Sequence, residues 1–224
     1  MDTQLSAIDH VTSIHQQGRS WSIRVRAVAV WRIPFDHITL TPSCLDMILM
    51  DRRGTKIQAS VCRRHPITRP IEVGRVYNIS HFKVVLNDGI RLTPHDFRLI
   101  FHTCTSVAES FDVRIPRNGL SFYNTQIIRN RVGDFTHLID CLGVISAAGQ
   151  DKLFIKDSQL TKMLHIDLQD SRGKIRCLLI GSLVNIVANY LASNWTKRPT
   201  NFSLKAHLYL QKFISTQTFM MLLS

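Results

Sequence analysis

Two apolar strands joined by a tight turn restrict the fold of this chain strongly, because the pattern occurs twice. The first copy runs from Asp46 to Val61, with its turn at Asp51 to Gly54. Gly accepts a positive φ without a Cβ clash, and an Asp carboxylate can accept hydrogen bonds from its own turn. The flanking β-branched and long apolar residues are typical of a half-buried hairpin. We therefore predict a β-hairpin over residues 45–62.

The second copy lies between Leu164 and Ile180 and lacks one residue of the turn. The matched pairs are Asp51 and Asp170, Arg53 and Arg172, Gly54 and Gly173, Lys56 and Lys174, and Ile57 and Ile175. A recurrence at this distance indicates a duplicated domain, since solenoid repeats have periods of only a few tens of residues. The 224 residues suffice for two domains. We expect a flexible N-terminus over 1–14, a first domain over 15–110, a linker over 111–130 and a second domain over 131–224.

The first half contains enough strands for a small barrel. Residues 21–33 alternate as a long strand, and 75–86 and 97–107 predict two more beside the hairpin. One face of the first strand would carry Trp21, Ile23, Val25, Ala27, Ala29, Trp31 and Ile33; the other would carry Ser22, Arg24, Arg26 and Arg32. Pro66 and Pro70 exclude a regular helix after the hairpin. Five strands are the count of an OB-fold, a partly open Greek-key barrel.

The second half repeats this order. Residues 135–149 open it, the 163–180 hairpin follows, and apolar residues from Ser182 to Ala192 recur with helical spacing. A helix at this place is typical of an OB-fold, and strands over 202–214 and 218–224 would close the barrel. The predicted class is all-β with minor α, two tandem OB-fold five-stranded Greek-key barrels. The sequence leaves open whether the second barrel is complete at its C-terminus.

The charge balance favours a polyanionic partner. The chain has 28 Lys and Arg against 16 Asp and Glu, a net charge of +12. The excess is shared by both halves, which is typical of an extended basic surface rather than of a charged tail. A basic solvated surface without such a partner is the alternative.

Cysteine usage and hydropathy exclude several classes of protein. The five cysteines are dispersed, odd in number and never in CxxC spacing, which argues against a disulfide framework and a zinc knuckle. The N-terminus lacks the features of a signal peptide, and the longest apolar run, 177–192, is too short and polar to span a bilayer. We expect a soluble protein of a reducing compartment, with no membrane partner.

No motif predicts catalysis. The sequence has no GK[ST] phosphate loop, no HExxH and no GxSxG. The ten histidines are scattered, and Asp167 and Asp170 suit the capping of a hairpin better than acid–base chemistry. We expect a protein that is not an enzyme and that holds no metal or cofactor.

Several spaced motifs resemble the plant proteins similar to the large subunit of replication protein A. In the first half they are Trp21-x-Ile-x-Val-Arg26, Asp46 to Asp51 with Gly54 and Lys56-Ile57, Gly74-x-Val76-Tyr77-x-Ile79-Ser80-x-Phe82, and Phe101-x-x-x-Thr105-x-Val107. In the second they are Asp134-Phe135, Asp140-x-x-Gly143-Val144 and Leu168-x-Asp170 with Gly173. The resemblance implies two tandem OB-folds that bind single-stranded DNA. It also implies a nuclear protein that works in a heterotrimer with other replication protein A subunits, in DNA replication and repair.

The chain departs from this family where bases are stacked. The resemblance implies an aromatic near the end of the third strand and another between strands four and five. The third-strand positions are Cys62 and Ile180, and the loop position falls near Ile90 and Arg91. Trp21, Trp31, Phe82 and Phe101 share faces with aliphatic residues, so we assign them to the core. We expect no counterpart of the large subunit's zinc-bearing third barrel in these 224 residues.

Basic side chains on one side of a β-surface can neutralise the phosphates of a single strand. The candidate nucleic-acid-binding residues lie on the first strand, at the two hairpin turns and on the strands that follow. They are Arg24, Arg26, Arg32, Arg52, Arg53, Lys56, Arg63, Arg64, Lys83, Arg91, Arg172, Lys174 and Arg176.

Two hypotheses therefore remain. The first is a sequence-tolerant, salt-sensitive single-stranded DNA-binding protein. The second is a diverged OB-fold module that binds acidic peptide segments and has weak or no DNA binding. The missing stacking aromatics favour the second, while the family resemblance and the charge favour the first.

Overall fold

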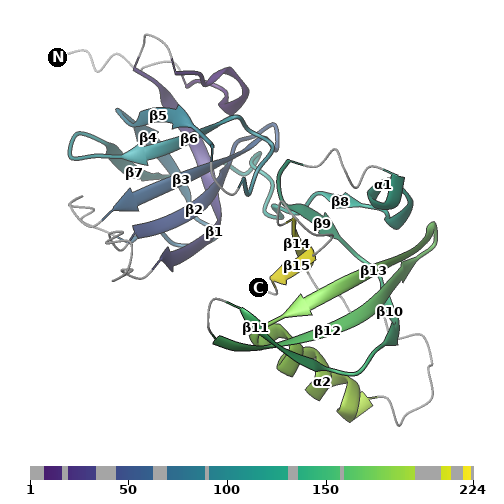
Figure 1. Cartoon of the computed structure of the whole chain (residues 1–224). Coiled ribbons are helices and arrows are strands. Elements are labelled where there is room, and N and C mark those ends of the chain that lie inside the picture. Colours follow the sequence, from purple (N-terminus) through teal and green to yellow (C-terminus); the bar gives the residue numbers. More distant parts are fainter. Residues whose placement is uncertain are drawn as a thin grey trace, which may run out of the picture. The chain divides into compact units, whose positions relative to one another are not determined.

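The computed structural model describes residues 8–16, 20–33, 44–62, 70–88, 91–130, 136–156, 159–194, 208–212 and 219–222 (Figure 1). The chain divides into two compact units, 1–119 and 120–224. Each unit is built mainly of strands, as expected from the sequence. Whether the units fold independently, with the domain boundaries expected above, stays a prediction.

The first unit contains one 3₁₀ turn and seven strands. They are η1 (Val11–Ser13), β1 (Ser22–Ile33), β2 (Cys44–Met50), β3 (Lys56–Cys62), β4 (Val76–Ser80), β5 (Lys83–Leu86), β6 (Phe97–Phe101) and β7 (Ser106–Ser110). The predicted hairpin is confirmed as β2 and β3, and the long first strand as β1. The predicted fourth and fifth strands each occur in two pieces. A break at His81, which has a φ of 59°, separates β4 from β5, and a turn over 102–105 separates β6 from β7.

Strand pairing gives the first unit the order of an OB-fold barrel. β1 pairs with β2 through its second half and with β4 through its first half. β3 pairs with β6 in parallel, and β6 and β7 pair antiparallel with β5 and β4. The two broken strands therefore close the sheet between β3 and β1, which makes a five-stranded barrel.

Apolar side chains on the inner face of this sheet form one core. Trp21, Phe82 and Phe101 are buried in it, as predicted, together with Leu49 and Leu99. These residues alternate with outward-facing ones along their strands, which is the period of a β-sheet with one buried face.

A β-bulge changes the face of β1 halfway along its length. Ala27 pairs with Leu49 and Ala29 pairs with Ile48, so Val28 is an extra residue. Beyond a bulge every side chain points to the opposite side from the one that simple alternation gives. The predicted common face of 21–33 is therefore correct only up to the bulge.

One aromatic residue and one basic residue lie on the opposite side of the sheet from the one predicted. Trp31 pairs with Asp46 on the outer side, so its assignment to the core is wrong. Arg32 pairs with Leu45, which packs against the core, so Arg32 does not share the outer face of Arg24 and Arg26.

Residues 111–117, which the sequence assigned to a linker, cross the outer side of the first barrel; we call them the strap. Ile115 is 1% exposed and packs with Met50, Val76 and Val28. Asp112 is also buried. The buried apolar contact holds the strap against the sheet, although its sequence has no strand or helix period.

The second unit begins with residues that were also assigned to the linker. Its elements are β8 (Phe122–Tyr123), α1 (Thr125–Asn130), β9 (Ile139–Cys141), β10 (Val144–Ala148), β11 (Lys152–Lys156), β12 (Gln159–Asp170), β13 (Gly173–Ile180), α2 (Ser182–Asn194), β14 (Leu208–Lys212) and β15 (Phe219–Leu222). α1 contacts β12 and β13, and its Ile128 belongs to the core of this unit.

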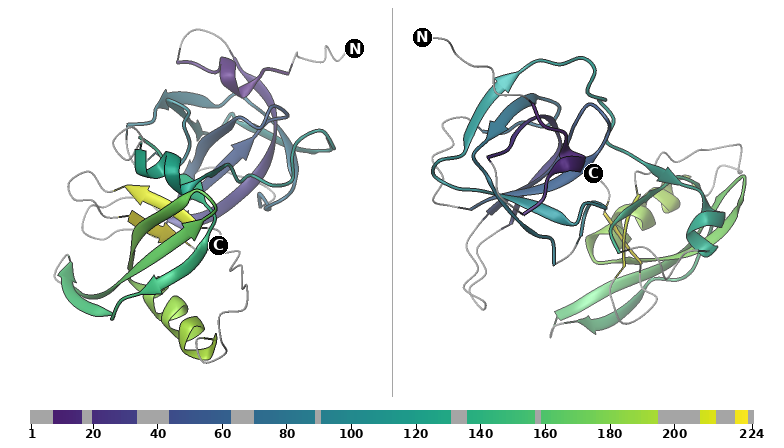
Figure 2. Two further views of the ribbon diagram at one scale, coloured as in Figure 1. Left: turned by 90° about the vertical axis from the view of Figure 1, so that its right-hand side faces the viewer. Right: turned by 90° about the horizontal axis from the view of Figure 1, so that it is seen from above.

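The second unit repeats the strand order of the first. β9 pairs with β14, while β10 and β11 pair with β12, as the two halves of β1 pair with β4 and β2. β12 forms the predicted hairpin with β13, and β15 pairs with β14 and contacts β13. The predicted helix is confirmed as α2, which lies against β12 and β13 (Figure 2) and buries Leu183, Val184 and Val187. The chain is thus an all-β protein of two OB-type barrels with minor α.

The duplicated turn has the same function in both hairpins. The Asp51 carboxylate accepts hydrogen bonds from the backbone N–H groups of Arg53, Thr55 and Val11. The Asp170 carboxylate accepts them from the N–H groups of Arg172, Gly173 and Thr125, and from the Thr125 hydroxyl. Each carboxylate ties its turn to the helical segment that precedes the barrel.

Two observations bear on the expected cellular setting. Cys104, Cys141 and Cys177 are free thiols, but Cys44 is disulfide-bonded, which the spacing of the cysteines did not predict. Strand pairing brings Cys44 opposite Cys62 in the ladder, a proximity that sequence spacing does not reveal. No helix in the described part of the chain is long and apolar enough to cross a membrane.

Candidate nucleic-acid interface

The outer sides of β1, β2, β3, β6 and β5 form a continuous surface, which we call the outer face. Cross-strand pairing orders it in rows, because residues directly opposite each other point to the same side. One row is Trp31, Asp46, Ser60, Ile100 and Lys83. The next row is Ala29, Ile48, Gln58, Arg98 and Val85.

Trp31 is the aromatic residue of this face. It is half-buried and makes no hydrogen bond or ring contact with any described residue. An indole held on a strand and open on one side can stack on a base of any sequence. The outer face therefore has a stacking platform on its first strand instead of its third.

A polar network occupies the middle of the outer face. The Ser60 hydroxyl donates to Asp46 Oδ1 at 2.6 Å and accepts a hydrogen bond from Arg98 Nη2. Gln58 is 4% exposed, and its Oε1 has no hydrogen-bond partner among the described residues; the same is true of the buried Nε of Arg98. An unpartnered buried polar atom costs stability, so these two atoms are a cost to the fold at the middle of the outer face.

Two lysines give the face positive charge. Lys83 ends the row of Trp31, is exposed and has no hydrogen bond or ion pair to a described residue. Lys56 pairs with Met50 on the same side of the sheet. Lys83 in particular can contact a phosphate at no cost to the fold.

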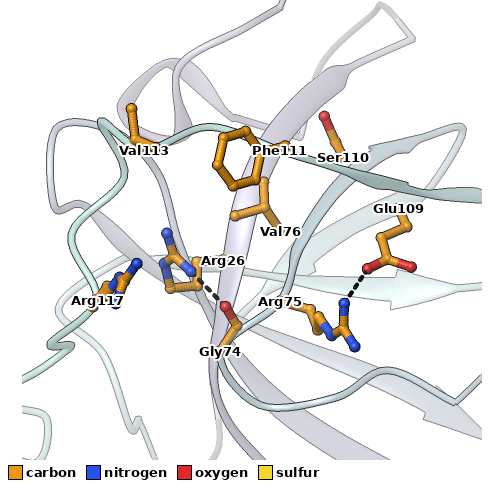
Figure 3. Close-up of a pocket in the computed structure, with 9 residues that line it drawn as sticks. All are labelled: Arg26, Gly74, Arg75, Val76, Glu109, Ser110, Phe111, Val113 and Arg117. Atoms are coloured by element: carbon orange, nitrogen blue, oxygen red, sulfur yellow. Dashed lines mark hydrogen bonds and ion pairs between the residues drawn. The ribbon is translucent and has the colours of Figure 1, made fainter.

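Arg24 and Arg26 lie on the outer side of β1 but beside the strap. The Arg26 guanidinium is buried and donates to the carbonyl oxygen of Gly74 (Figure 3). It also donates to the carbonyl oxygens of Ile115 and Pro116, with a longer contact to that of Asp112. Arg24 donates to Asn78 Oδ1 at 2.8 Å and lies 3.9 Å from Asp112 Oδ2. Arg26 thus holds the strap, and we leave it out of the interface.

The other predicted residues of the first unit lie in loops or at strand ends. Arg52 and Arg53 are exposed in the β2–β3 turn, and Arg52 contacts His10 Nε2 at 3.4 Å. Arg91 is held by Asp96 and by the carbonyl oxygen of Pro94. Arg63 and Arg64 lie outside the described residues.

The second barrel presents a weaker version of the same surface. Lys174 and Arg176 lie on the outer side of β13, but both form ion pairs with Asp167, at 3.7 and 3.1 Å. Arg172 is exposed in the turn. Phe154 faces outward with Thr161, so this barrel also carries an aromatic on its first strand.

The third-strand position is not aromatic in the second barrel, where Ile180 is half-buried opposite Met163. The side chain of Cys62 and residue Ile90 lie outside the described residues. Sequence reasoning missed Trp31, Arg98 and Phe154. For Arg98 the signal was present, because Phe97, Leu99 and Phe101 alternate with it.

The described residues contain no cluster of metal ligands, and their two buried cysteines are poor nucleophiles. No group of three or more His, Cys, Asp or Glu side chains there could hold a metal ion. Burial raises the pKa of the Cys141 and Cys177 thiols to about 12, so neither is a thiolate at neutral pH. The absence of catalysis stays a prediction.

Several solved structures resemble the chain weakly. A chain of a replication protein A heterotrimer bound to single-stranded DNA matches at a TM-score of 0.48 and 14% identity; the match covers 91% of this chain and 46% of that one. A murine DNA-binding protein bound to double-stranded DNA matches at 0.43 and 8%, with 89% and 90% covered. The Ifi202 HINa domain in complex with 20-bp double-stranded DNA matches at 0.42 and 10%, with 92% and 91% covered.

These likenesses are too low to carry an argument about function, and this chain spans about half the length of the replication protein A chain. No curated protein matches the sequence. The family match is firmer, because it covers residues 12–131, more than half of the 224 residues. The protein belongs to the DUF223 family, described as a domain of unknown function.

Proposed function

We propose that this protein binds single-stranded nucleic acid across the outer face of its first barrel. The observation that carries the proposal is the row that joins Trp31 to Lys83 across five strands. A stacking ring and an unpaired cation on one β-surface are the two elements of sequence-tolerant single-strand binding. The net charge of +12 adds a long-range attraction for a polyanion.

The finer proposal is a DNA-binding protein of the replication protein A large-subunit type. It rests on the resemblance of the spaced motifs in both halves of the sequence. On this proposal the protein acts in the nucleus, in DNA replication or repair, beside other replication protein A subunits, and it has no catalytic activity of its own.

One observation favours the second candidate, a module for acidic peptide segments. On the outer side of the second barrel, Lys174 and Arg176 already hold the carboxylate of Asp167. A surface that binds its own carboxylate in this way can bind the carboxylates of a partner.

The test is a fluorescence anisotropy titration of labelled oligo-dT with the full chain at several salt concentrations. Log K should fall with log salt by about 0.7 for each neutralised phosphate of a single strand. Trp31→Ala should weaken binding by about 1–3 kcal/mol with an unchanged slope, because it removes a stacking contact. Lys83→Ala should flatten the slope by about 0.7, because it removes one phosphate contact.

Arg129→Ala is the matched control, since Arg129 is an exposed arginine on α1 and belongs to the second unit. It should change neither affinity nor slope. If the wild type does not bind oligo-dT at low salt, the nucleic-acid proposal is wrong and the acidic-peptide module replaces it. If oligo-dT binds but Trp31→Ala and Lys83→Ala have no effect, the outer face is not the interface.

A further inference from the structure

The strap leaves a pocket on the first unit that is separate from the rows of the outer face. It has a volume of about 460 Å³ and is lined by residues of the strap together with Arg26, Arg75, Val76 and Glu109 (Figure 3). This volume lies in the range of small-ligand sites, about 300–1,000 Å³. The pocket opens beside the first half of β1, on the outer side of the same strand that carries Trp31.

Two apolar side chains of the strap are exposed at this pocket. Phe111 is 83% exposed and Val113 is 73% exposed, whereas Asp112 between them is buried. The backbone beneath them is fixed, because Ile115 is buried and Arg26 binds the carbonyl groups of 115 and 116. A phenyl ring exposed on a fixed backbone loses little entropy on binding, so it suits a contact surface.

The charges of the pocket are not balanced. Arg75 pairs with Glu109 at 2.8 Å and with Glu72 at 3.3 Å, so its charge is already compensated. Arg26 and Arg117 also line the pocket, and no carboxylate among the described residues forms an ion pair with either. Arg117 is exposed and forms no hydrogen bond to a described residue. The donors of Arg26 are already used by carbonyl groups, so the exposed guanidinium of Arg117 is the group that favours an anionic occupant.

A neighbouring pocket provides a contrast. It is smaller, about 200 Å³, and is lined by Arg24, Arg52 and Arg114 together with Asp9, Asp51 and Asp112. There the three arginines are equalled in number by three carboxylates, and Arg24 and Arg114 pair with Asp112 at 3.9 and 2.8 Å. Of these two pockets, the pocket of Phe111 is the one whose lining has more arginines than carboxylates.

We propose that this pocket is a second contact site for the same single strand, in which a base stacks on Phe111 and its phosphate binds Arg117. The inference rests on the proposed function and extends it beyond the outer face. Arg26 pairs with Met50 and Trp31 with Asp46, four residues apart on β2, so the two sites are separated by about 13 Å at 3.3 Å per residue. A strand must therefore be longer to occupy both sites than to occupy the outer face alone.

The experiment compares a short and a long labelled oligo-dT, of about 5 and about 16 nucleotides, the range of site sizes known for single OB-folds. Phe111→Ala and Arg117→Ala should leave affinity for the short strand unchanged. Phe111→Ala should lower the affinity for the long oligonucleotide about fivefold or more, which is the effect of one lost stacking contact. Since Phe111 is 83% exposed, its truncation should not lower the melting temperature.

The controls are Leu86→Ala, an exposed apolar residue on β5, and Arg129→Ala on α1, neither of which lines the pocket. Neither should change the affinity for either strand. A direct readout comes from Phe111→Trp, whose added tryptophan fluorescence should be quenched by the long strand and not by the short one.

The outcomes separate this inference from the proposed function. If Trp31→Ala weakens the binding of both oligonucleotides but Phe111→Ala weakens the binding of neither, the outer face remains the interface and the pocket site is overturned. If Phe111→Ala abolishes binding of a synthetic acidic peptide with one Phe and does not affect the oligonucleotides, the pocket is a peptide site and the inference is wrong. If no oligonucleotide binds the wild type, both proposals fail.

Discussion

Replacing Arg26 with Met tests whether this arginine holds the strap or serves as a phosphate contact. Its guanidinium makes three hydrogen bonds of normal or short length to backbone carbonyl groups, those of Gly74, Ile115 and Pro116. The contact to the Asp112 carbonyl, at 3.5 Å, is at the limit of a hydrogen bond and contributes little. Met has a similar length and no donor, so it leaves the three carbonyl groups without their partner.

The size of the effect follows from two limits. Hydrogen bonds to a charged group contribute about 1.5–3 kcal/mol each, so three would give about 4.5–9 kcal/mol if the strap stayed in place. The strap can instead detach, which loses the burial of Ile115, about 1.5–3 kcal/mol, and lets water solvate the carbonyl groups. Removing a buried charge also returns part of its desolvation cost. We expect Arg26→Met to lower the free energy of unfolding by about 2–4 kcal/mol.

Urea unfolding and thermal melting of the full chain would measure this, followed by tryptophan fluorescence, to which Trp21 in the core of the first unit contributes. The matched control is Arg24→Met, two residues away on the same side of β1. Arg24 makes one side-chain hydrogen bond and a 3.9 Å ion pair, so it should cost less than about 1 kcal/mol. A loss below about 0.5 kcal/mol for Arg26→Met, or equal losses for both variants, would refute the structural assignment of Arg26.

Three further predictions concern the turns and the strap. Gly54 has a φ of +77° and no atom within 4 Å of an added Cβ, so Gly54→Val should cost only backbone strain, about 1–2 kcal/mol; an unchanged melting temperature would contradict this. Hydrogen bonds from Arg114 lower the pKa of Asp112 to about 2, so its contribution is complete above pH 4 and is lost as the pH falls towards 2. Because Arg114 is largely exposed, we expect the free energy of unfolding to fall by only about 1–2 kcal/mol in acid. Urea unfolding at several pH values would measure this loss, and the Asp112→Asn variant should not show it. Asp170→Ala removes four hydrogen bonds to the turn and to Thr125, and it should cost about 2–4 kcal/mol and speed amide exchange in α1; unchanged exchange would mean that Asp170 does not anchor the helix.

Local chemistry made several features predictable from the sequence. The hairpins at 44–62 and 159–180 have turns in which a carboxylate satisfies neighbouring N–H groups and a glycine takes a positive φ. α2 follows from the spacing of its apolar residues, and the inner face of β1 up to Ala27 follows from strict alternation. These signals involve residues close in sequence, so the chain shows them without any knowledge of its tertiary structure.

The position of Trp31 could not be predicted in this way. The run from Ala27 to Val30 contains only apolar residues, so no polar residue shows which side of the sheet each one faces. A bulge in this run therefore cannot be recognised from the sequence. Only the pairing of β1 with β2 shows that Val28 is an extra residue. That single insertion turns Trp31 from the core to the outer face and creates the stacking platform on which the proposed function depends.

The strap shows the same limit at longer range. Its sequence has one proline and no period and is followed by Asn118 and Gly119, which are the signals of a linker. Arg24 and Arg26 have the spacing of outward-facing phosphate contacts. Sequence alone determined that these arginines lie on the outer side of β1, and that the chain has two barrels and a large positive charge. Only the tertiary structure decided that Ile115 is buried against Met50 and Val76, and that its carbonyl group accepts a hydrogen bond from Arg26. The physical reason is that this contact joins residues almost ninety positions apart, and its stability comes from excluded water and satisfied carbonyl groups that no local pattern of residues records.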